Sequence, residues 1–80
     1  MKHAREDYNR IQDPENLIPE DEPVFLLRAK DIVAPQVVAY WVEQAHKAGA
    51  DKKITDAAIE QVARMAQWQT NHGSKIPDMP

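Results

Sequence analysis

The sequence of this 80-residue chain is centred on residues 22–48, which read EPVFLLRAKDIVAPQVVAYWVEQAHKA. The stretch opens with four apolar residues, Val24 to Leu27, between a proline and a charged cluster. This pattern is typical of a short strand with both faces covered. A short helix with Pro23 at its first position is the alternative for residues 24–29. We expect the strand.

Two helices are predicted after this strand. Pro35 suits the first turn of a helix that ends at Ala48, because Gly49 is a natural residue to follow a helix. A second helix should begin near Asp51 or Thr55, since either side chain is a competent N-cap. It runs to about His72 and stops at Gly73. The short connection around Gly49 implies an antiparallel helical hairpin.

Each predicted helix carries an apolar stripe at three- and four-residue spacing, which is the pattern of a buried face. In the first helix the stripe comprises Val37 or Val38, Trp41, Ala45 and Ala48. In the second helix it comprises Ala58, Ile59, Val62, Met65 and Ala66, with Trp68 at its edge. On this interpretation Trp41 belongs to the core and Trp68 is partly exposed.

The N-terminal residues 1–23 are predicted to form an irregular acidic arm. Residues 1–12 have the composition of one or two helical turns, and residues 13–23 hold three prolines and five acids, which favours an extended segment. Leu17 and Ile18 are its expected anchor on the body of the protein. The arm either wraps a neighbouring subunit or is loose. The second predicted part, residues 24–80, contains the strand, the hairpin and an extended tail.

Two observations predict a homo-oligomer. The chain is short, and it has no cysteine to compensate for a small core with disulfides or thiolate metal sites. The sequence also shows no second convincing strand, so the strand at Val24–Leu27 would pair with the same strand of another copy.

The composition argues against several classes of function. Residues 1–23 carry seven acids and three bases, and residues 24–80 carry six acids and seven bases. This balance disfavours general nucleic-acid binding, which needs many contacts to phosphate. No apolar run approaches the length of a membrane span and no signal-peptide pattern is present, so we expect the cytosol of a host cell.

Catalytic and metal-binding patterns are scarce. The chain has two glycines, both where helix ends need them, and three histidines that lie far apart without metal-ligand spacing. Ser74 is the only serine and has no adjacent base. The acids at 20–22 lack the spacing of a calcium loop and are better explained as solvated charge. We expect no enzyme, no metal and no cofactor.

A ligand-binding function is better supported, because aromatic and basic side chains occur near one another. Aromatic faces stack on nucleobases, while Arg and Lys bind phosphate. A purely structural role remains the alternative for each residue. The candidate ligand-binding residues are Arg28, Lys30, Tyr40, Arg64, Trp68 and Lys75.

Several segments resemble short proteins encoded by phages and prophages. They are DEPVFLLRAKD, APQVVAYW, MAQWQ and the tail KIPDMP. The resemblance implies a phage-related origin. By class and size, it extends to counter-defence sponges, which are oligomers that enclose cyclic nucleotide signals without cleaving them.

The sequence therefore predicts a mainly α protein, with one short strand and an acidic arm before a helical hairpin, assembled as a homo-oligomer. The expected function is sequestration of a small anionic ligand, such as a cyclic oligonucleotide, at a subunit interface. A protein-interaction module that uses the acidic arm and Trp68 is the alternative, and a minor virion component is a third.

Overall fold

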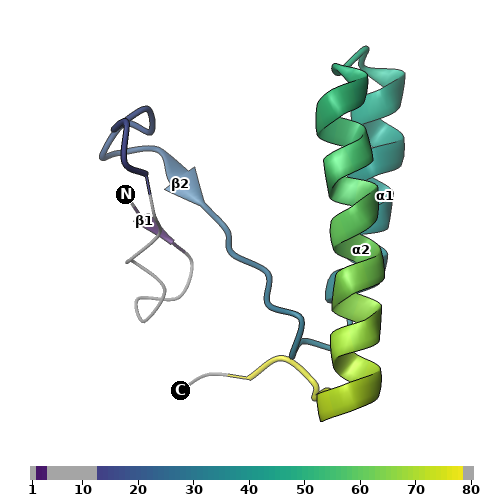
Figure 1. Ribbon diagram of the computed structural model, residues 1–80. Coiled ribbons are helices and arrows are strands. Elements are labelled where there is room, and N and C mark those ends of the chain that lie inside the picture. The colour runs from purple at the N-terminus through teal and green to yellow at the C-terminus, as the bar shows by residue number, and fades with distance from the viewer. Residues whose placement is uncertain (1, 4–12, 79–80) are drawn as a thin grey trace. The chain divides into compact units, whose positions relative to one another are not determined.

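A computed structural model describes residues 2–3 and 13–78, and this part of the chain is mainly helical (Figure 1). Its elements are strands β1 (Lys2–His3) and β2 (Pro23–Val24) and helices α1 (Ala34–Lys47) and α2 (Lys52–His72). The described residues fall into two compact units. One contains the residues up to Leu27 together with Asp78, and the other runs from Arg28 to Pro77.

The strand prediction is confirmed in kind but not in length or pairing. β2 covers only Pro23–Val24, and residues 25–28 have no regular structure. Its partner is β1 of the same chain, in a parallel pair that joins Lys2 to Pro23 and His3 to Val24. The expectation that the strand must pair with another copy is therefore wrong. The partner strand β1 could not be predicted from the sequence, because a strand of two residues is too short to show an alternating pattern of apolar and polar residues.

The apolar residues expected to form a strand with both faces covered are instead partly exposed. Val24 is half-buried, while the Phe25 and Leu26 side chains that follow it are 68% and 40% exposed. Apart from Lys2–His3, the predicted helical turns of residues 1–12 lie outside the described residues.

The described part of the acidic arm is built from turns. Both carboxylate oxygens of Asp13 accept backbone hydrogen bonds, from the Leu17 and Ile18 N–H groups at 3.1 and 3.0 Å. A second turn forms where the Glu22 N–H donates to the Pro19 carbonyl oxygen at 3.1 Å. Of the two expected anchors, Ile18 is half-buried and Leu17 is 74% exposed, and their anchoring on the body of the protein stays a prediction.

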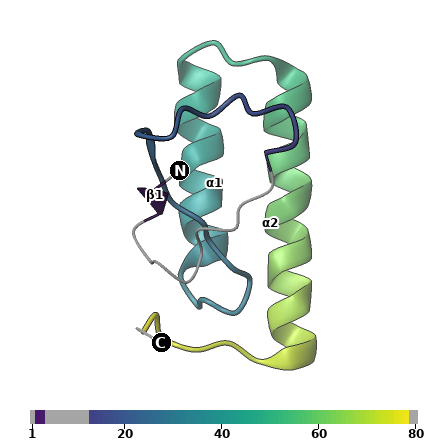
Figure 2. The ribbon, with the colours of Figure 1, turned by 90° about the vertical axis from the view of Figure 1, so that its left-hand side faces the viewer.

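The hairpin prediction is confirmed: α1 and α2 pack side by side in opposite directions (Figures 1 and 2). α1 starts with a proline in its first turn, as expected from Pro35. It ends in a Schellman motif, in which Gly49 at φ +86° donates to the His46 carbonyl while the Ala50 N–H donates to that of Ala45.

The ends of α2 also follow local signals in the sequence. Asp51 caps its N-terminus, because one carboxylate oxygen accepts a hydrogen bond from the Lys53 N–H at 2.8 Å. At the other end, the Gly73 N–H donates to the Gln69 carbonyl oxygen at 2.7 Å, and Gly73 has φ +81°. Within the described residues, neither helix is long and apolar enough to cross a membrane.

The hairpin has little core of its own. Among the described residues, only Ala34, Thr55 and Met65 are buried. Trp41 is 48% exposed, so its expected place in the core is wrong. The side of α1 that packs on α2 is the neighbouring one, with Ala34 buried and Val38, Val42 and Ala45 half-buried.

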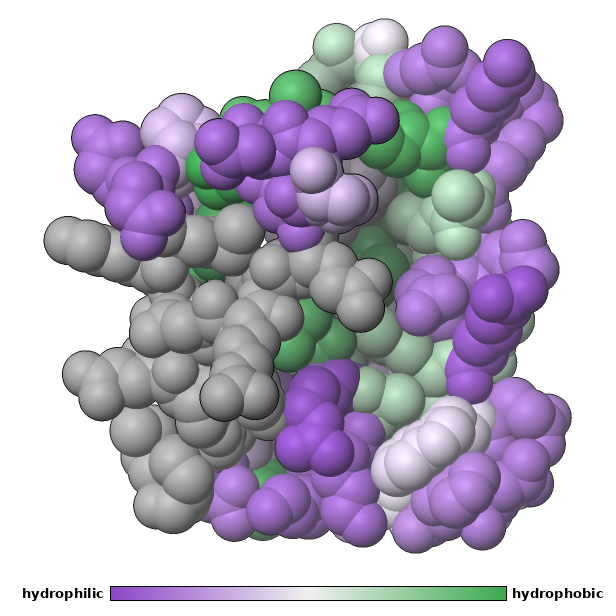
Figure 3. Space-filling view, turned by 60° about the vertical axis from the view of Figure 1, so that its left-hand side comes forward, coloured by the Kyte–Doolittle hydropathy of each residue, from purple (hydrophilic) through white to green (hydrophobic). Residues whose placement is uncertain are grey.

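Large apolar side chains remain at the surface of the hairpin and of the segment before it. Figure 3 shows green, apolar surface between purple, polar side chains on the face in view. In the hairpin and the segment before it, the large apolar side chains exposed by two fifths or more are those of Ile32, Val33, Val37, Tyr40, Trp41, Ile54 and Ile59. Two helices form one layer, and a stable core needs a second layer against it. The apolar surface of this unit therefore exceeds what the hairpin itself covers.

Candidate ligand-binding site

The end of the hairpin opposite the α1–α2 loop brings distant parts of the sequence together. We call this end the hairpin base and define it as residues 29–33 and 68–75. The Lys75 N–H donates to the Lys30 carbonyl oxygen, and the Ile32 N–H donates to the Lys75 carbonyl oxygen, both at 2.9 Å. This exchange is a parallel bridge. It holds the segment after α2 against the segment before α1.

The side chain of Gln69 joins α2 to the segment before α1. Its side-chain amide nitrogen donates to the carbonyl oxygens of Ala29 and Asp31, each at 2.9 Å. The Asp31 carboxylate also accepts from the Val33 N–H at 2.9 Å, directly before α1. These bonds leave the hairpin base with a defined backbone. The role of Gln69 could not be predicted, because nothing in the sequence distinguishes it from the other glutamines.

An aromatic pair lies on this framework. The rings of Trp68 and His72 are stacked, with centroids 4.4 Å apart and planes 17° from parallel. The His72 Nδ1 lies 3.0 Å from the Trp68 carbonyl oxygen, which fixes the imidazole one turn along the helix. The Lys30 Nζ lies 5.9 Å from the centroid of the Trp68 ring, within the range of a cation–π contact.

Three of the six candidate residues thus lie together at the hairpin base. Lys30 contacts the Trp68 ring, and Lys75 is hydrogen-bonded through its backbone to Lys30. Trp68 is half-buried, as expected for a residue at the edge of the apolar stripe. The stacking of His72 on Trp68 was not predicted.

The other three candidates lie outside this cluster. Arg28 directly precedes the hairpin base, where its carbonyl oxygen accepts from the Asp31 N–H at 3.0 Å. Arg64 lies one turn before Trp68 on α2, and its guanidinium forms an ion pair with Glu60 at 2.8 Å. Tyr40 lies in the middle of α1 and is 64% exposed.

The chemistry of the hairpin base suits an anion that carries a flat ring. The Lys30 ammonium lies near the indole of Trp68, and this indole and the imidazole stacked on it provide aromatic faces. Ammonium groups bind phosphate, while aromatic faces stack on bases. No cluster of three or more His, Cys, Asp or Glu with the geometry of a metal site occurs among the described residues.

Comparison with protein-family models, with curated proteins and with solved structures finds no match to this chain.

Proposed function

We propose that this protein is a non-enzymatic, phage-type binding protein that sequesters a small anionic ligand at an interface between identical subunits. A cyclic oligonucleotide is the ligand that its chemistry fits best. The observation that carries the proposal is the position of the Lys30 ammonium, 5.9 Å from the Trp68 ring centroid. It places a cation and an aromatic face in one cluster, as a base joined to a phosphate requires.

The proposed ligand also matches the cluster in its chemistry. The Lys30 ammonium can leave the face of the Trp68 indole and bind a phosphate group, because a charged phosphate binds an ammonium more strongly than an aromatic ring does. The indole face then becomes available to a base. One hairpin base supplies one indole, whereas a cyclic dinucleotide carries two bases and two phosphates. Two copies of the hairpin base would therefore match one cyclic dinucleotide.

The proposed assembly is supported by the exposed apolar side chains of the hairpin. Trp41 and Ile54 are 48% and 54% exposed, although burying such side chains is favourable by about 1.5–3 kcal/mol each. A second copy would supply the missing layer. The phage-type description rests on the sequence resemblance alone.

Isothermal titration calorimetry with cyclic di- and trinucleotides tests the proposal. The wild-type chain should bind at least one of them, while Trp68→Ala and Lys30→Ala should each weaken binding tenfold or more. That loss corresponds to about 1.4 kcal/mol, within the usual contribution of a stacked base. Lys53→Ala, an exposed lysine of α2 away from the hairpin base, is the matched control and should bind as the wild type does.

Two further variants separate a lost contact from a lost fold. Trp68→Phe keeps an aromatic face and should retain most of the affinity, and circular dichroism should show wild-type helix content in every variant. Wild-type affinity in both Trp68→Ala and Lys30→Ala would refute the proposed site. Indifference of the wild-type chain to every nucleotide would refute the proposed ligand class.

A protein-interaction module is the second candidate. It is favoured by exposed aromatic side chains on α1, where Tyr40 and Trp41 are 64% and 48% exposed. Large exposed apolar and aromatic side chains are common anchors of protein–protein interfaces. This candidate predicts that nucleotides leave the thermal stability unchanged, whereas Tyr40→Ala and Trp41→Ala abolish capture of a host or phage protein.

A further inference from the structure

One side of the hairpin carries an apolar groove between its two helices. Its lining consists of Ala39, Val42, Ile59, Val62, Ala63 and Ala66. Half of these residues are alanines, whose small side chains allow close approach, and Ile59 is 54% exposed. We call this surface the hairpin groove.

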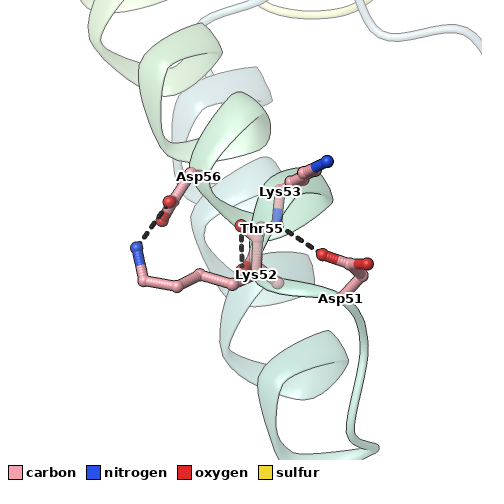
Figure 4. Close-up of polar contacts among 5 residues, drawn as sticks. All are labelled: Asp51, Lys52, Lys53, Thr55 and Asp56. Carbon is pink, nitrogen blue, oxygen red and sulfur yellow. Dashed lines mark hydrogen bonds and ion pairs between the residues drawn. The ribbon is translucent and has the colours of Figure 1, made fainter.

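At the α1–α2 loop, the hairpin groove widens into a hollow of about 500 Å³ with an apolar floor that includes Val42, Ala50 and Ile59. An ion pair flanks the hollow on each helix. On α1 the Lys47 Nζ lies 3.3 Å from a Glu43 carboxylate oxygen. On α2 the Lys52 Nζ lies 2.7 Å from a carboxylate oxygen of Asp56 (Figure 4).

The two ion pairs have the same polarity along the hairpin. Because α1 runs toward the loop and α2 runs away from it, Lys47 and Lys52 both lie at the loop. Glu43 and Asp56 both lie four residues farther from it, a rise of about 6 Å. The hollow is therefore bordered by a positive row beside the loop and by a negative row one turn away.

We propose that the hollow is the docking surface for a second copy of this chain, packed face to face and antiparallel. The two-fold axis would lie in the interface, perpendicular to the helices and between the two charged rows. This operation sets the lysine row of each copy opposite the acidic row of the other. Such an interface is self-complementary, as a two-fold dimer requires.

Charge selects this arrangement over the parallel one. If the two-fold axis ran along the helices, the lysine rows of the two copies would face each other, and so would the acidic rows. Like charges placed opposite each other across an interface repel and disfavour the assembly. In the antiparallel arrangement all four facing pairs are attractive.

The inference rests on the proposed self-assembly and extends it by assigning one interface. This interface covers the loop end of the hairpin and leaves the hairpin base, with Lys30 and Trp68, available to a different subunit contact. Ligand binding and loop-end docking are therefore separable by mutation.

Two complementary charge variants test the inference. Lys47→Glu with Lys52→Glu makes both rows acidic, and Glu43→Lys with Asp56→Lys makes both rows basic. Each variant alone should show an assembly mass at most half that of the wild type in native mass spectrometry. An equimolar mixture should recover the wild-type assembly with equal numbers of the two variants.

The matched control changes a neighbouring lysine. Lys53→Glu makes the same charge change one residue beyond Lys52, but its side chain points away from the Lys52–Asp56 pair (Figure 4). Lys53→Glu should assemble as the wild type does. Lys52→Glu alone should raise the dissociation constant of the assembly at least threefold. If circular dichroism shows that either double variant has lost its helices, the comparison of Lys52→Glu with Lys53→Glu tests the docking surface instead.

The outcomes separate the inference from the proposed function. Wild-type assembly of both double variants, or loss in both without recovery on mixing, would overturn the docking surface alone. A wild-type chain that stays monomeric at every concentration would overturn the proposed self-assembly as well.

Discussion

The two ends of the helical hairpin are held together in different ways. At the loop end, each bond joins residues that are close in sequence: Asp51 caps α2 through Lys53, and the Gly49 turn closes within five residues. At the hairpin base, Gln69 reaches carbonyl groups 38 and 40 residues away. The loop end is therefore assembled from local structure, whereas the base exists only once the hairpin has closed.

This difference bears on function. At the hairpin base, long-range bonds join the backbones of Lys30 and Lys75, and the Lys30 ammonium lies near the Trp68 ring. The loop end offers two rows of charge on rigid helices, which suits recognition of another surface. Because their supports differ, a mutation at one end should leave the other end intact.

The largest effect should come from breaking the long-range support of the base. Gln69→Leu removes the donor to two carbonyl oxygens in a half-buried setting. We expect the free energy of unfolding to fall by about 2–3 kcal/mol, since unsatisfied polar groups cost about 1–3 kcal/mol. Urea denaturation at a fixed chain concentration measures the change.

Gln67→Leu is the matched control for this variant. Its exposed side chain donates a hydrogen bond to the Asn71 Oδ1 on the next turn, at 3.2 Å, so the loss should stay below about 0.5 kcal/mol. Equal effects of the two variants would show that Gln69 does not hold the base.

A smaller effect is expected from the loop end. Gly49 has φ +86°, and apart from Gly49 and its chain neighbours no heavy atom of the described residues lies within 4 Å of the position that a Cβ would occupy. Gly49→Ala should therefore cost only backbone strain, about 1.5 kcal/mol. Thermal denaturation should show this loss, and Gly49→Asn, which tolerates the left-handed conformation, should recover part of it. An unchanged melting temperature in Gly49→Ala would contradict the assigned turn.

The smallest effect concerns the charged rows themselves. The hydrogen bond to Asp56, followed by its negative charge, raises the pKa of Lys52 above its ordinary value of 10.5. Because the folded pKa exceeds the unfolded one, the ion pair stabilises the fold below pH 10.5, and this contribution is lost as the pH rises through the folded pKa. An NMR titration should find a lower Lys52 pKa in Asp56→Asn than in the wild type, and a higher or equal one would contradict the pair.

The boundaries of the hairpin could be predicted because each depends on a residue that acts within one turn. Pro35, Gly49, Asp51 and Gly73 all mark helix ends through their own backbone or side-chain geometry, and the helices begin and end within two residues of these signals. Contacts between residues that are distant in the sequence have no such local signal. The pairing of β2 with Lys2–His3 and the bonds from Gln69 depend on which segments meet after folding.

Trp41 illustrates a different limit. α1 has adjacent apolar residues on two sides, so three- and four-residue spacing fits Val37 and Trp41 as well as Val38 and Val42. Contact with α2 decides between them, and it half-buries Val38 and Val42 while Trp41 stays 48% exposed. For the candidate site, the sequence predicted the residue types. Only the fold shows that Lys30, Trp68 and Lys75 lie together, while Tyr40 lies in the middle of α1.

The central claim is that the hairpin completes its core with further copies of itself. Sedimentation equilibrium of the full chain at micromolar concentration tests this most directly. The account predicts one species whose mass is a whole-number multiple, two or greater, of the 9.1 kDa chain mass. A single species of 9.1 kDa across the whole concentration range would contradict it.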